Sequence, residues 1–370
     1  MPRKLVILYT ANYCNKMRNV FDVETLIKDY EIDFLNLSKI TAHEELAPVY
    51  TDGLKEFNVE NLFQFLKYVW ENRKASPVYA SVMNYGFFSY KVYLILSVFR
   101  CTFVTVTNGA LPKSPMWNNV SKKRKIFRKI NVGDYISKIF FKTPLIRPAD
   151  YALVSSKKGG VPYKTNKNTQ IFNSSSGDYL DAINIKRKSK DKIGNYIVFL
   201  DQNVPFHPDN NLLKIKTVDE VDYYSIMNNY FRELENKYQC EVIIAAHPSS
   251  IKYKDHNFFE GRKVVFNQTA ELVLGCIGVL THTTTAVSYA VAYKKPILLL
   301  SMPGFPEQDY IYMRVLSSEL EIKVVDISKS VDVEFGNISI SAYERYRVNY
   351  LSTVENGITN AQIFSLILNE

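Results

Sequence analysis

The chain has 370 residues, of which 46% are hydrophobic and 22% are charged. This composition is rich enough in apolar residues to form sizeable cores, so it excludes disordered and collagen-like proteins. The length favours two domains. The formal net charge is +9, and the four cysteines form no closely spaced pair. We therefore expect neither a thiolate metal cluster nor a disulfide framework, and a reducing compartment is the simpler interpretation.

No apolar run reaches the roughly 18–20 residues that a membrane-spanning helix needs. The first residues are basic, and the apolar run that follows them stops at Asn12. This pattern indicates a first buried strand and not a signal peptide. We therefore expect a cytoplasmic protein, with attachment to the inner face of the cytoplasmic membrane as a further option.

In the first half of the chain, short apolar runs alternate with longer amphipathic stretches, as in a parallel sheet with crossover helices. Strands are predicted over 5–9, 32–37, 78–83, 102–106 and 151–155, and helices over 61–72 and 89–99. The stretch 164–195 changes character, with Asn-Ser-Ser-Ser-Gly at 173–177 and a basic run at 186–190. We place a domain boundary near 190.

In the second half, strands are predicted over 196–200, 241–246, 263–266, 277–281, 296–300 and 323–327. The helices predicted between them cover 218–238, 269–275, 284–293 and 309–320. The fold class is therefore α/β with two Rossmann-like domains, one over 1–190 and one over 191–345. A C-terminal helical tail over 346–370 completes the chain.

Ligands of open parallel sheets bind beyond the carboxyl ends of the strands. In the second domain the residues at these positions are rich in imidazole, carboxylate, amide and hydroxyl groups. They are Asp201, Gln202, Asn203, His247, Pro248, Ser249, His282, Thr283, Thr284, Thr285 and Glu307.

In the segment 278–300, a predicted strand is followed by three threonines at the start of a predicted helix of small residues. Thr283 or Thr284 is a natural N-cap, and free N–H groups at a helix start favour an anion such as phosphate. An ordinary cap without a ligand is the competing interpretation.

In the segment 242–250, a predicted strand ends at His247, and Pro248 prevents the strand from continuing. An imidazole there can donate to a phosphate or a ribose, or neutralise a leaving phosphate when protonated. A structural histidine is the alternative. Asp201 follows a buried strand at the predicted cleft, where it can be a general base, a nucleophile or an orienting group. A plain turn residue is the alternative.

The chain resembles the GT-B glycosyltransferases in three features. It has two Rossmann-like halves, a HisPro after a strand of the second half, and a hydroxyl cluster before a later helix. The closer resemblance is to bacterial transferases that use CMP-activated ulosonic acids, namely sialyltransferases and Kdo transferases. It covers about residues 195–300. It implies two domains facing a central cleft, with CMP held by His247-Pro248 and by Thr283, Thr284 and Thr285.

The acidic pair followed by glycine that supplies the base in such sialyltransferases is not found. The resemblance to retaining β-Kdo transferases is better in this respect, and Asp201 matches their proposed nucleophile by location. Asp201 would thus be nucleophile in a retaining enzyme or base in an inverting one, with His247 as its catalytic partner. No acidic pair stands at a strand end, so we expect neither an obligatory metal nor another cofactor.

The acceptor is expected against the first domain, at Asn84, Tyr85 and Asn108, which follow strands there. Plain turns are the competing interpretation. The basic segment 121–129 lies in a region with Trp117 and Ile136, and such clusters suit an anionic membrane. The expected acceptor is a glycan or lipid-linked molecule of bacterial surface polysaccharides. No recognised motif indicates nucleic-acid binding.

Two other functions stay open. The same fold could use a UDP- or GDP-sugar, as a transferase or as an epimerase, which would release UDP without an acceptor. The chain could also be a non-catalytic scaffold of glycan assembly, which would bind CMP without turnover.

Overall fold

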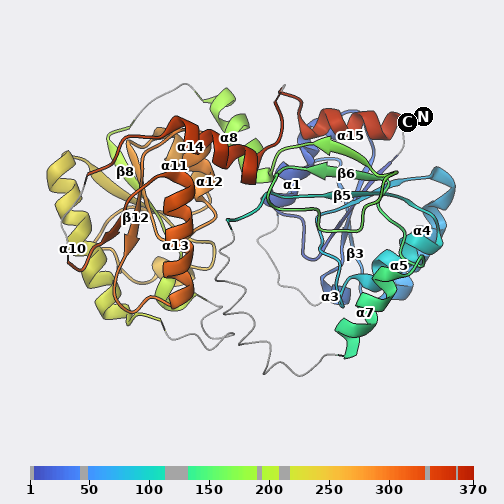
Figure 1. Cartoon of the computed structure of the whole chain (residues 1–370), viewed down its shortest axis with the longest axis horizontal. Coiled ribbons are helices and arrows are strands. Elements are labelled where there is room, and N and C mark those ends of the chain that lie inside the picture. The colour runs from blue at the N-terminus through green and yellow to red at the C-terminus, as the bar shows by residue number, and fades with distance from the viewer. Residues whose placement is uncertain are drawn as a thin grey trace. The chain divides into compact units, whose positions relative to one another are not determined.

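A computed structural model describes residues 4–41, 49–112, 132–189, 194–207, 217–329, 334–355 and 357–370. The described residues form two compact units (Figure 1). The first unit holds the described residues up to Ala110, those from 132 to Leu180, and those from Val348 to Glu370. The second unit holds Leu111, Pro112 and the described residues from Asp181 to Arg347. The basic segment 121–129 and Trp117 lie outside the described residues.

The first unit is built on a seven-stranded parallel sheet with the order β3-β2-β1-β4-β5-β6-β7. Its strands are β1 (Leu5–Tyr9), β2 (Ile32–Asn36), β3 (Lys55–Asn58), β4 (Val78–Ser81), β5 (Thr102–Val106), β6 (Tyr151–Val154) and β7 (Gln170–Asn173). Its helices are α1 (Asn15–Phe21), α2 (Val23–Leu26), α3 (Ser38–Thr41), α4 (Leu62–Asn72), α5 (Tyr90–Val98), α7 (Val132–Lys142) and α15 (Asn360–Asn369). Helix α8 (Gly177–Lys188) begins in the first unit and ends in the second.

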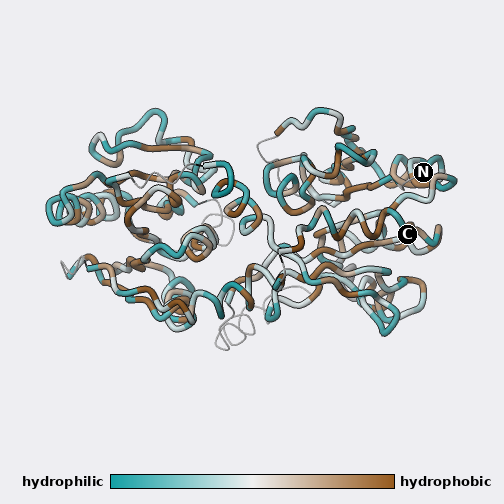
Figure 2. The backbone as a smooth tube through the Cα atoms, turned by 90° about the horizontal axis from the view of Figure 1, so that it is seen from above, coloured by the Kyte–Doolittle hydropathy of each residue, from teal (hydrophilic) through white to brown (hydrophobic). Residues whose placement is uncertain are grey.

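Alternating residues of β1 divide the core of the first unit into two layers. Leu5 and Ile7 pack with residues of α1, α2 and α15, whereas Val6 and Leu8 pack with residues of α4 and α5 on the other face. This two-sided burial explains why the central strands are continuous apolar runs. Figure 2 shows the same distribution, with hydrophobic segments inside and hydrophilic ones in the outer loops.

The second unit has a six-stranded parallel sheet with the order β10-β9-β8-β11-β12-β13. Its strands are β8 (Tyr196–Leu200), β9 (Glu241–Ala245), β10 (Val264–Val265), β11 (Gly278–Thr281), β12 (Ile297–Ser301) and β13 (Val324–Asp326). Its helices are α10 (Glu220–Tyr238), α11 (Thr269–Gly275), α12 (Val287–Ala292), α13 (Glu307–Leu320) and α14 (Ile340–Tyr346). Shorter turns of helix lie at Val204–Phe206 and Ile251–Lys254, and a π-helical turn lies at Arg347–Leu351.

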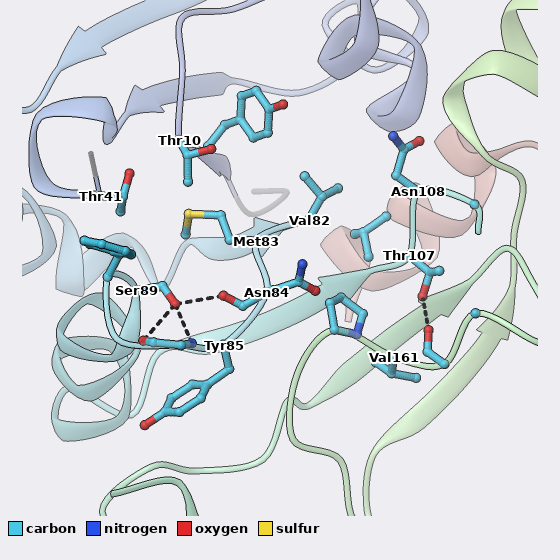
Figure 3. A pocket seen from close by; sticks show the side chains of 18 of the residues that line it. Thr10, Thr41, Val82, Met83, Asn84, Tyr85, Ser89, Thr107, Asn108 and Val161 are labelled. Atoms are coloured by element: carbon cyan, nitrogen blue, oxygen red, sulfur yellow. Dashed lines mark hydrogen bonds between the residues drawn. The ribbon is translucent and has the colours of Figure 1, made fainter. Parts of the chain in front are cut away.

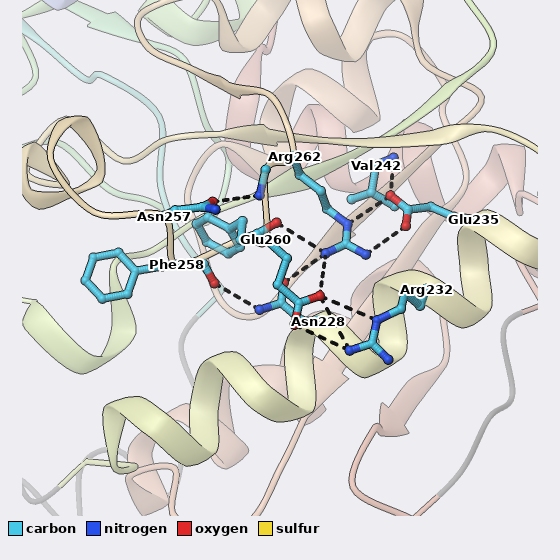
Figure 4. Close-up of polar contacts among 10 residues, drawn as sticks. Asn228, Arg232, Glu235, Val242, Asn257, Phe258, Glu260 and Arg262 are labelled. Carbon is cyan, nitrogen blue, oxygen red and sulfur yellow. Dashed lines mark hydrogen bonds and ion pairs between the residues drawn. The ribbon is translucent and has the colours of Figure 1, made fainter.

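A polar cluster fastens the connection between β9 and β10 to α10 (Figure 4). Arg262 donates twice to Glu235, at 2.9 Å and 2.7 Å, and once to Asn228 Oδ1 at 2.9 Å. Glu235 also accepts the N–H of Val242 in β9 at 3.1 Å. A bidentate arginine–carboxylate pair is among the stronger polar contacts in proteins, so this cluster fixes α10 against the sheet.

The predicted α/β class with two parallel-sheet domains is confirmed. The edge strands β3 and β7 were not predicted, because their side chains are mostly exposed and carry no apolar run. The two units divide after Leu180, about ten residues before the boundary expected near 190. The C-terminal segment 346–370 was expected to be a separate tail, but from Val348 onward it belongs to the first unit. The serines at 174–176 are buried there, and so are part of that unit's interior.

Candidate functional site

In both sheets the strand order reverses beside the first strand, between β1 and β4 and between β8 and β11. This is the order of the classical dinucleotide-binding fold, in which ligands bind beyond the carboxyl ends of the strands at the reversal point. The predicted site residues therefore fall into two groups, one in each unit.

Asp201, directly after β8, is the centre of the group in the second unit. Its Oδ1 accepts the Asn203 N–H at 2.9 Å and the Tyr253 hydroxyl at 3.2 Å. Its Oδ2 accepts the Ser250 hydroxyl at 2.9 Å and the His247 N–H at 3.3 Å. The residue is only 3% exposed.

These contacts decide what the Asp201 carboxylate can do. Burial raises the pKa of Asp201, and the four hydrogen bonds act in the opposite direction. Because four donors surround its two oxygens, little acceptor capacity is left for a substrate. Of the three roles considered for this residue, the environment favours the orienting one, in which the carboxylate fixes the loop that follows β9.

Gln202 and Asn203 connect β8 to the strands on either side of it. Gln202 Oε1 accepts the Thr283 N–H at 2.5 Å, and its Nε2 donates to Thr283 Oγ1 at 3.0 Å. Asn203, in the left-handed region at φ 54°, donates from Nδ2 to Ser249 Oγ at 3.2 Å. The segment 201–203 thus ties the HisPro loop after β9 to the threonine loop after β11.

His247 is half-buried and has one ring nitrogen engaged. Its Nδ1 accepts the Ser249 N–H at 3.2 Å and lies 2.7 Å from Ser249 Oγ. A neutral ring that accepts at Nδ1 carries its proton on Nε2, and no hydrogen bond to Nε2 is found among the described residues. Burial and the nearby His207, whose ring centroid is 5.5 Å away, lower the pKa of His247 below 6.5. Pro248 is exposed beside it.

The threonine loop differs from the expected helix cap. Helix α12 begins at Val287, and its N-cap is Ala286, not Thr283 or Thr284. Thr284 Oγ1 instead accepts the Ala286 N–H at 3.2 Å, forming a turn before the helix. Thr285 is exposed and Thr283 half-buried, so these two present the loop's accessible surface.

His282 lies in the core, and this corrects the expectation that it borders a ligand. Its Nδ1 donates to the Leu300 carbonyl at 2.7 Å, and its Nε2 accepts the Tyr223 hydroxyl at 2.9 Å. Burial lowers its pKa from 6.5 to about 4. Both ring nitrogens are therefore engaged inside the unit, and the ring is neutral.

Glu307 is exposed at the first position of α13, and among the described residues no hydrogen bond joins it to the loops after β8, β9 and β11. Sequence reasoning missed its neighbour Asp309, whose pKa burial raises to about 6. It also missed Tyr253, which donates to Asp201 from a short helical turn without any motif to mark it.

The first unit contains a pocket of about 560 Å³ at its own reversal point (Figure 3). The three residues expected to contact the acceptor, Asn84, Tyr85 and Asn108, all line it. Asn108 Oδ1 accepts the Gly177 N–H at 2.9 Å, while the Tyr85 hydroxyl donates to the Ser137 carbonyl at 2.8 Å. The structure thus brings these residues together, although Tyr85 uses its hydroxyl in a structural bond.

Among the described residues, no group of three or more histidine, cysteine or acidic side chains is arranged to hold a metal ion. Within the same residues, no helix has both the length and the apolar character to cross a bilayer.

Solved structures with this architecture cover nearly the whole chain. The H444N variant of the wall teichoic acid polymerase TagF matches with a TM-score of 0.57 and 13% identity, over 100% of this chain and 88% of that one. The same variant soaked with CDPG matches with a TM-score of 0.53 and 12% identity, over the same shares. The UDP-GlcNAc 2-epimerase of Methanocaldococcus jannaschii matches with a TM-score of 0.52 and 12% identity, over 98% and 99%.

No protein-family model and no curated protein matches the chain by sequence. The structural likenesses establish the fold, and they confirm that it is of the GT-B type.

Proposed function

We propose that the protein is a GT-B glycosyltransferase that binds a nucleotide-activated sugar in the second unit and its acceptor in the first. The observation that carries the proposal is the linkage of three strand ends by the segment 201–203. Its side chains hold the HisPro loop after β9 and the threonine loop after β11 at the reversal point of the sheet. In this proposal, the nucleotide phosphate is bound by His247 Nε2–H and by the hydroxyls of Thr283 and Thr285.

In the proposed reaction, the bond between the anomeric carbon and the nucleotide phosphate oxygen breaks, and a bond from the acceptor hydroxyl oxygen to that carbon forms. The acceptor hydroxyl proton passes to the departing nucleotide phosphate. The Nε2–H of neutral His247 donates a hydrogen bond to the departing phosphate, on which negative charge develops. Asp201 acts as a positioning residue, because it holds the His247 backbone and Ser250. No step requires a metal, so activity should persist in EDTA.

For the donor we propose a CMP-activated ulosonic acid of the Kdo or sialic acid type. The support is the resemblance of His247-Pro248 and Thr283–Thr285 to the CMP-binding motifs of those transferases, together with the linkage of the two loops in the structure. The acceptor in this proposal is a glycan or lipid-linked molecule of bacterial surface polysaccharides, bound at the first-unit pocket. The reaction then takes place in the cytoplasm, at the inner face of the membrane.

A thermal-shift comparison of CMP, UDP and GDP tests the donor. CMP should raise the melting temperature of the native protein, and this rise should be lost in His247→Ala but kept in His256→Ala, which replaces an exposed histidine. Stabilisation by UDP or GDP but not by CMP would overturn the CMP-sugar assignment and keep the transferase. Nucleotide binding without turnover on any donor would indicate the scaffold function.

A UDP-sugar epimerase is the second candidate, and the fold shared with UDP-GlcNAc 2-epimerase over 98% of this chain and 99% of that one favours it. The assay is incubation with UDP-GlcNAc and no acceptor, followed by separation of the products. Formation of an epimerised sugar, with UDP either attached or released, would select the epimerase. Stable UDP-GlcNAc would exclude the epimerase.

A further inference from the structure

Helices α4, α5 and α7 cover one face of the first sheet, opposite the face that carries α1 and α15 (Figure 1). Helix α5 contacts both α4 and α7, so the three helices form one continuous layer. We call the outer side of this layer the α4–α5–α7 face. It uses none of the strand-end residues of the proposed active site.

Large apolar side chains are exposed across the α4–α5–α7 face. On α4, Phe63, Leu66 and Trp70 follow each other at helical spacing and are 73%, 40% and 51% exposed. Val98 on α5 is 67% exposed, and Ile139 on α7 is 48% exposed. Trp70 packs edge-on against Phe99, with ring centroids 5.9 Å apart, so the apolar surface continues from α4 to α5. Large apolar side chains exposed on neighbouring helices are typical of an interaction surface.

The charges on these helices are mostly positive. In the ranges 62–74, 90–100 and 132–142, the cations are Lys67, Arg73, Lys74, Lys91, Arg100, Lys138 and Lys142. The two carboxylates are Asp134 and Glu71, and Glu71 lies 3.8 Å from Lys67. Seven cations against two anions leave an excess of five positive charges. The Arg73 guanidinium lies 3.6 Å from the centre of the Trp70 ring, so apolar and basic groups are interleaved.

We propose that the α4–α5–α7 face docks on an anionic lipid bilayer. Phenylalanine, leucine and tryptophan side chains that protrude between lysines and arginines can enter the headgroup region while the cations pair with lipid phosphates. Each such cation strengthens binding at an anionic surface roughly fivefold. A nucleic acid would use the charge but would not require the row of exposed apolar side chains. The inference is independent of the proposed activity, because it concerns only this surface.

The test is sedimentation of the full chain with vesicles of phosphatidylcholine, alone or mixed with phosphatidylglycerol, in the absence of nucleotide. We expect binding only to the mixed vesicles. The double variant Lys138→Gln/Lys142→Gln should weaken it roughly tenfold or more. The double variant Phe63→Ser/Trp70→Ser should weaken it to a similar degree. All four side chains are exposed, so the fold should be kept, which circular dichroism checks.

Matched controls come from elsewhere on the first unit. Ile358→Ser/Leu366→Ser removes apolar side chains that are 45% and 56% exposed, and Lys28→Gln/Lys167→Gln removes two exposed cations. Both variants should bind vesicles like the native chain. In a Trp117→Phe background, the fluorescence of Trp70 should shift to the blue on binding.

Equal vesicle binding by the face variants and their controls would overturn the proposal. A different result would also overturn it, namely salt-sensitive RNA binding that is lost in Lys138→Gln/Lys142→Gln but kept in Phe63→Ser/Trp70→Ser. If Trp70 fluorescence did not shift either, the partner would be a polyanion and not a bilayer. Loss of vesicle binding with nucleotide binding intact would support the proposal. Failure of nucleotide binding alone would count against the proposed activity and not against this surface.

Discussion

Asp201 shows how one buried carboxylate can organise a site that it does not itself enter. Two backbone N–H groups and two hydroxyls converge on its oxygens, and they come from Asn203, His247, Ser250 and Tyr253. A charged acceptor in the interior makes each of these bonds stronger than a neutral one would be. The position of the His247 ring therefore depends on a residue one strand away.

Asp201→Asn tests whether this residue positions or reacts. The new amide carries N–H groups where the carboxylate accepted, so buried donors lose a partner. We expect the free energy of unfolding to fall by about 1–3 kcal/mol and CMP affinity to fall with it. Urea unfolding and isothermal titration measure the two, with the exposed Glu233→Gln as the control. Unchanged stability and CMP binding with abolished transfer would instead favour the nucleophile role.

His282 should make stability depend on pH. Its pKa is lowered from 6.5 to about 4 in the folded chain, so between these values the unfolded chain binds a proton that the folded chain does not. Stability should therefore rise with pH across this window, by about 3 kcal/mol from this group. Unfolding of the native chain and of His282→Gln at several pH values measures the difference. NMR titration of His282 near its ordinary pKa would show this account to be wrong.

At the scale of elements, the chain's C-terminal segment completes the first unit through hydrogen bonds as well as apolar packing. Asn360, which is fully buried at the start of α15, donates to the carbonyls of Val20 and Ser175 at 2.8 Å and 2.9 Å. It also accepts the Ser175 N–H at 3.0 Å. One side chain thus joins the last helix to α1 and to the loop after β7.

Asn360→Ala should accordingly lower the free energy of unfolding by about 3 kcal/mol, because it leaves three buried backbone groups without a partner. Asn369→Ala, at the exposed end of the same helix, should change it little. Chemical denaturation of both variants provides the comparison. Equal stability of the two would mean that α15 is held by its apolar side chains alone.

A side chain can be added at one position of the first-unit pocket without a steric clash. A Cβ on Gly86 would meet no atom within 4 Å, and Gly86 lines the pocket. Gly86→Leu should raise the KM for the acceptor while leaving nucleotide binding and melting temperature unchanged. Gly336→Leu, at an equally open position in the second unit, is the matched control. Unaltered acceptor kinetics in Gly86→Leu would place the acceptor elsewhere.

The sequence predicts elements best where packing is two-sided. The central strands are runs of apolar residues and were predicted, whereas β3 and β7 are edge strands whose exposed residues show no such run. Helix α12 starts later than predicted, because Thr284 forms its own turn. The local sequence pattern does not reveal which of several neighbouring threonines forms a turn and which caps the helix.

At the scale of the whole molecule, apolar runs mark where the strands end, so sequence reasoning could place Asp201, His247 and Asn108 at the carboxyl edges of their sheets. It could not tell a residue that faces solvent from one that faces the core. His282 has the same sequence context as a ligand-binding histidine, and only the position of Tyr223 and Leu300 shows that its ring is enclosed. Tyr253 likewise reaches Asp201 through tertiary packing that no spacing predicts.

The most direct measurement is a crystal structure of the protein with CMP. The proposed function predicts the CMP phosphate within hydrogen-bonding distance of His247 Nε2 and the threonine loop, with Asp201 still bonded to Ser250 and Tyr253. CMP bound elsewhere, with the loops after β8, β9 and β11 free of ligand, would contradict it.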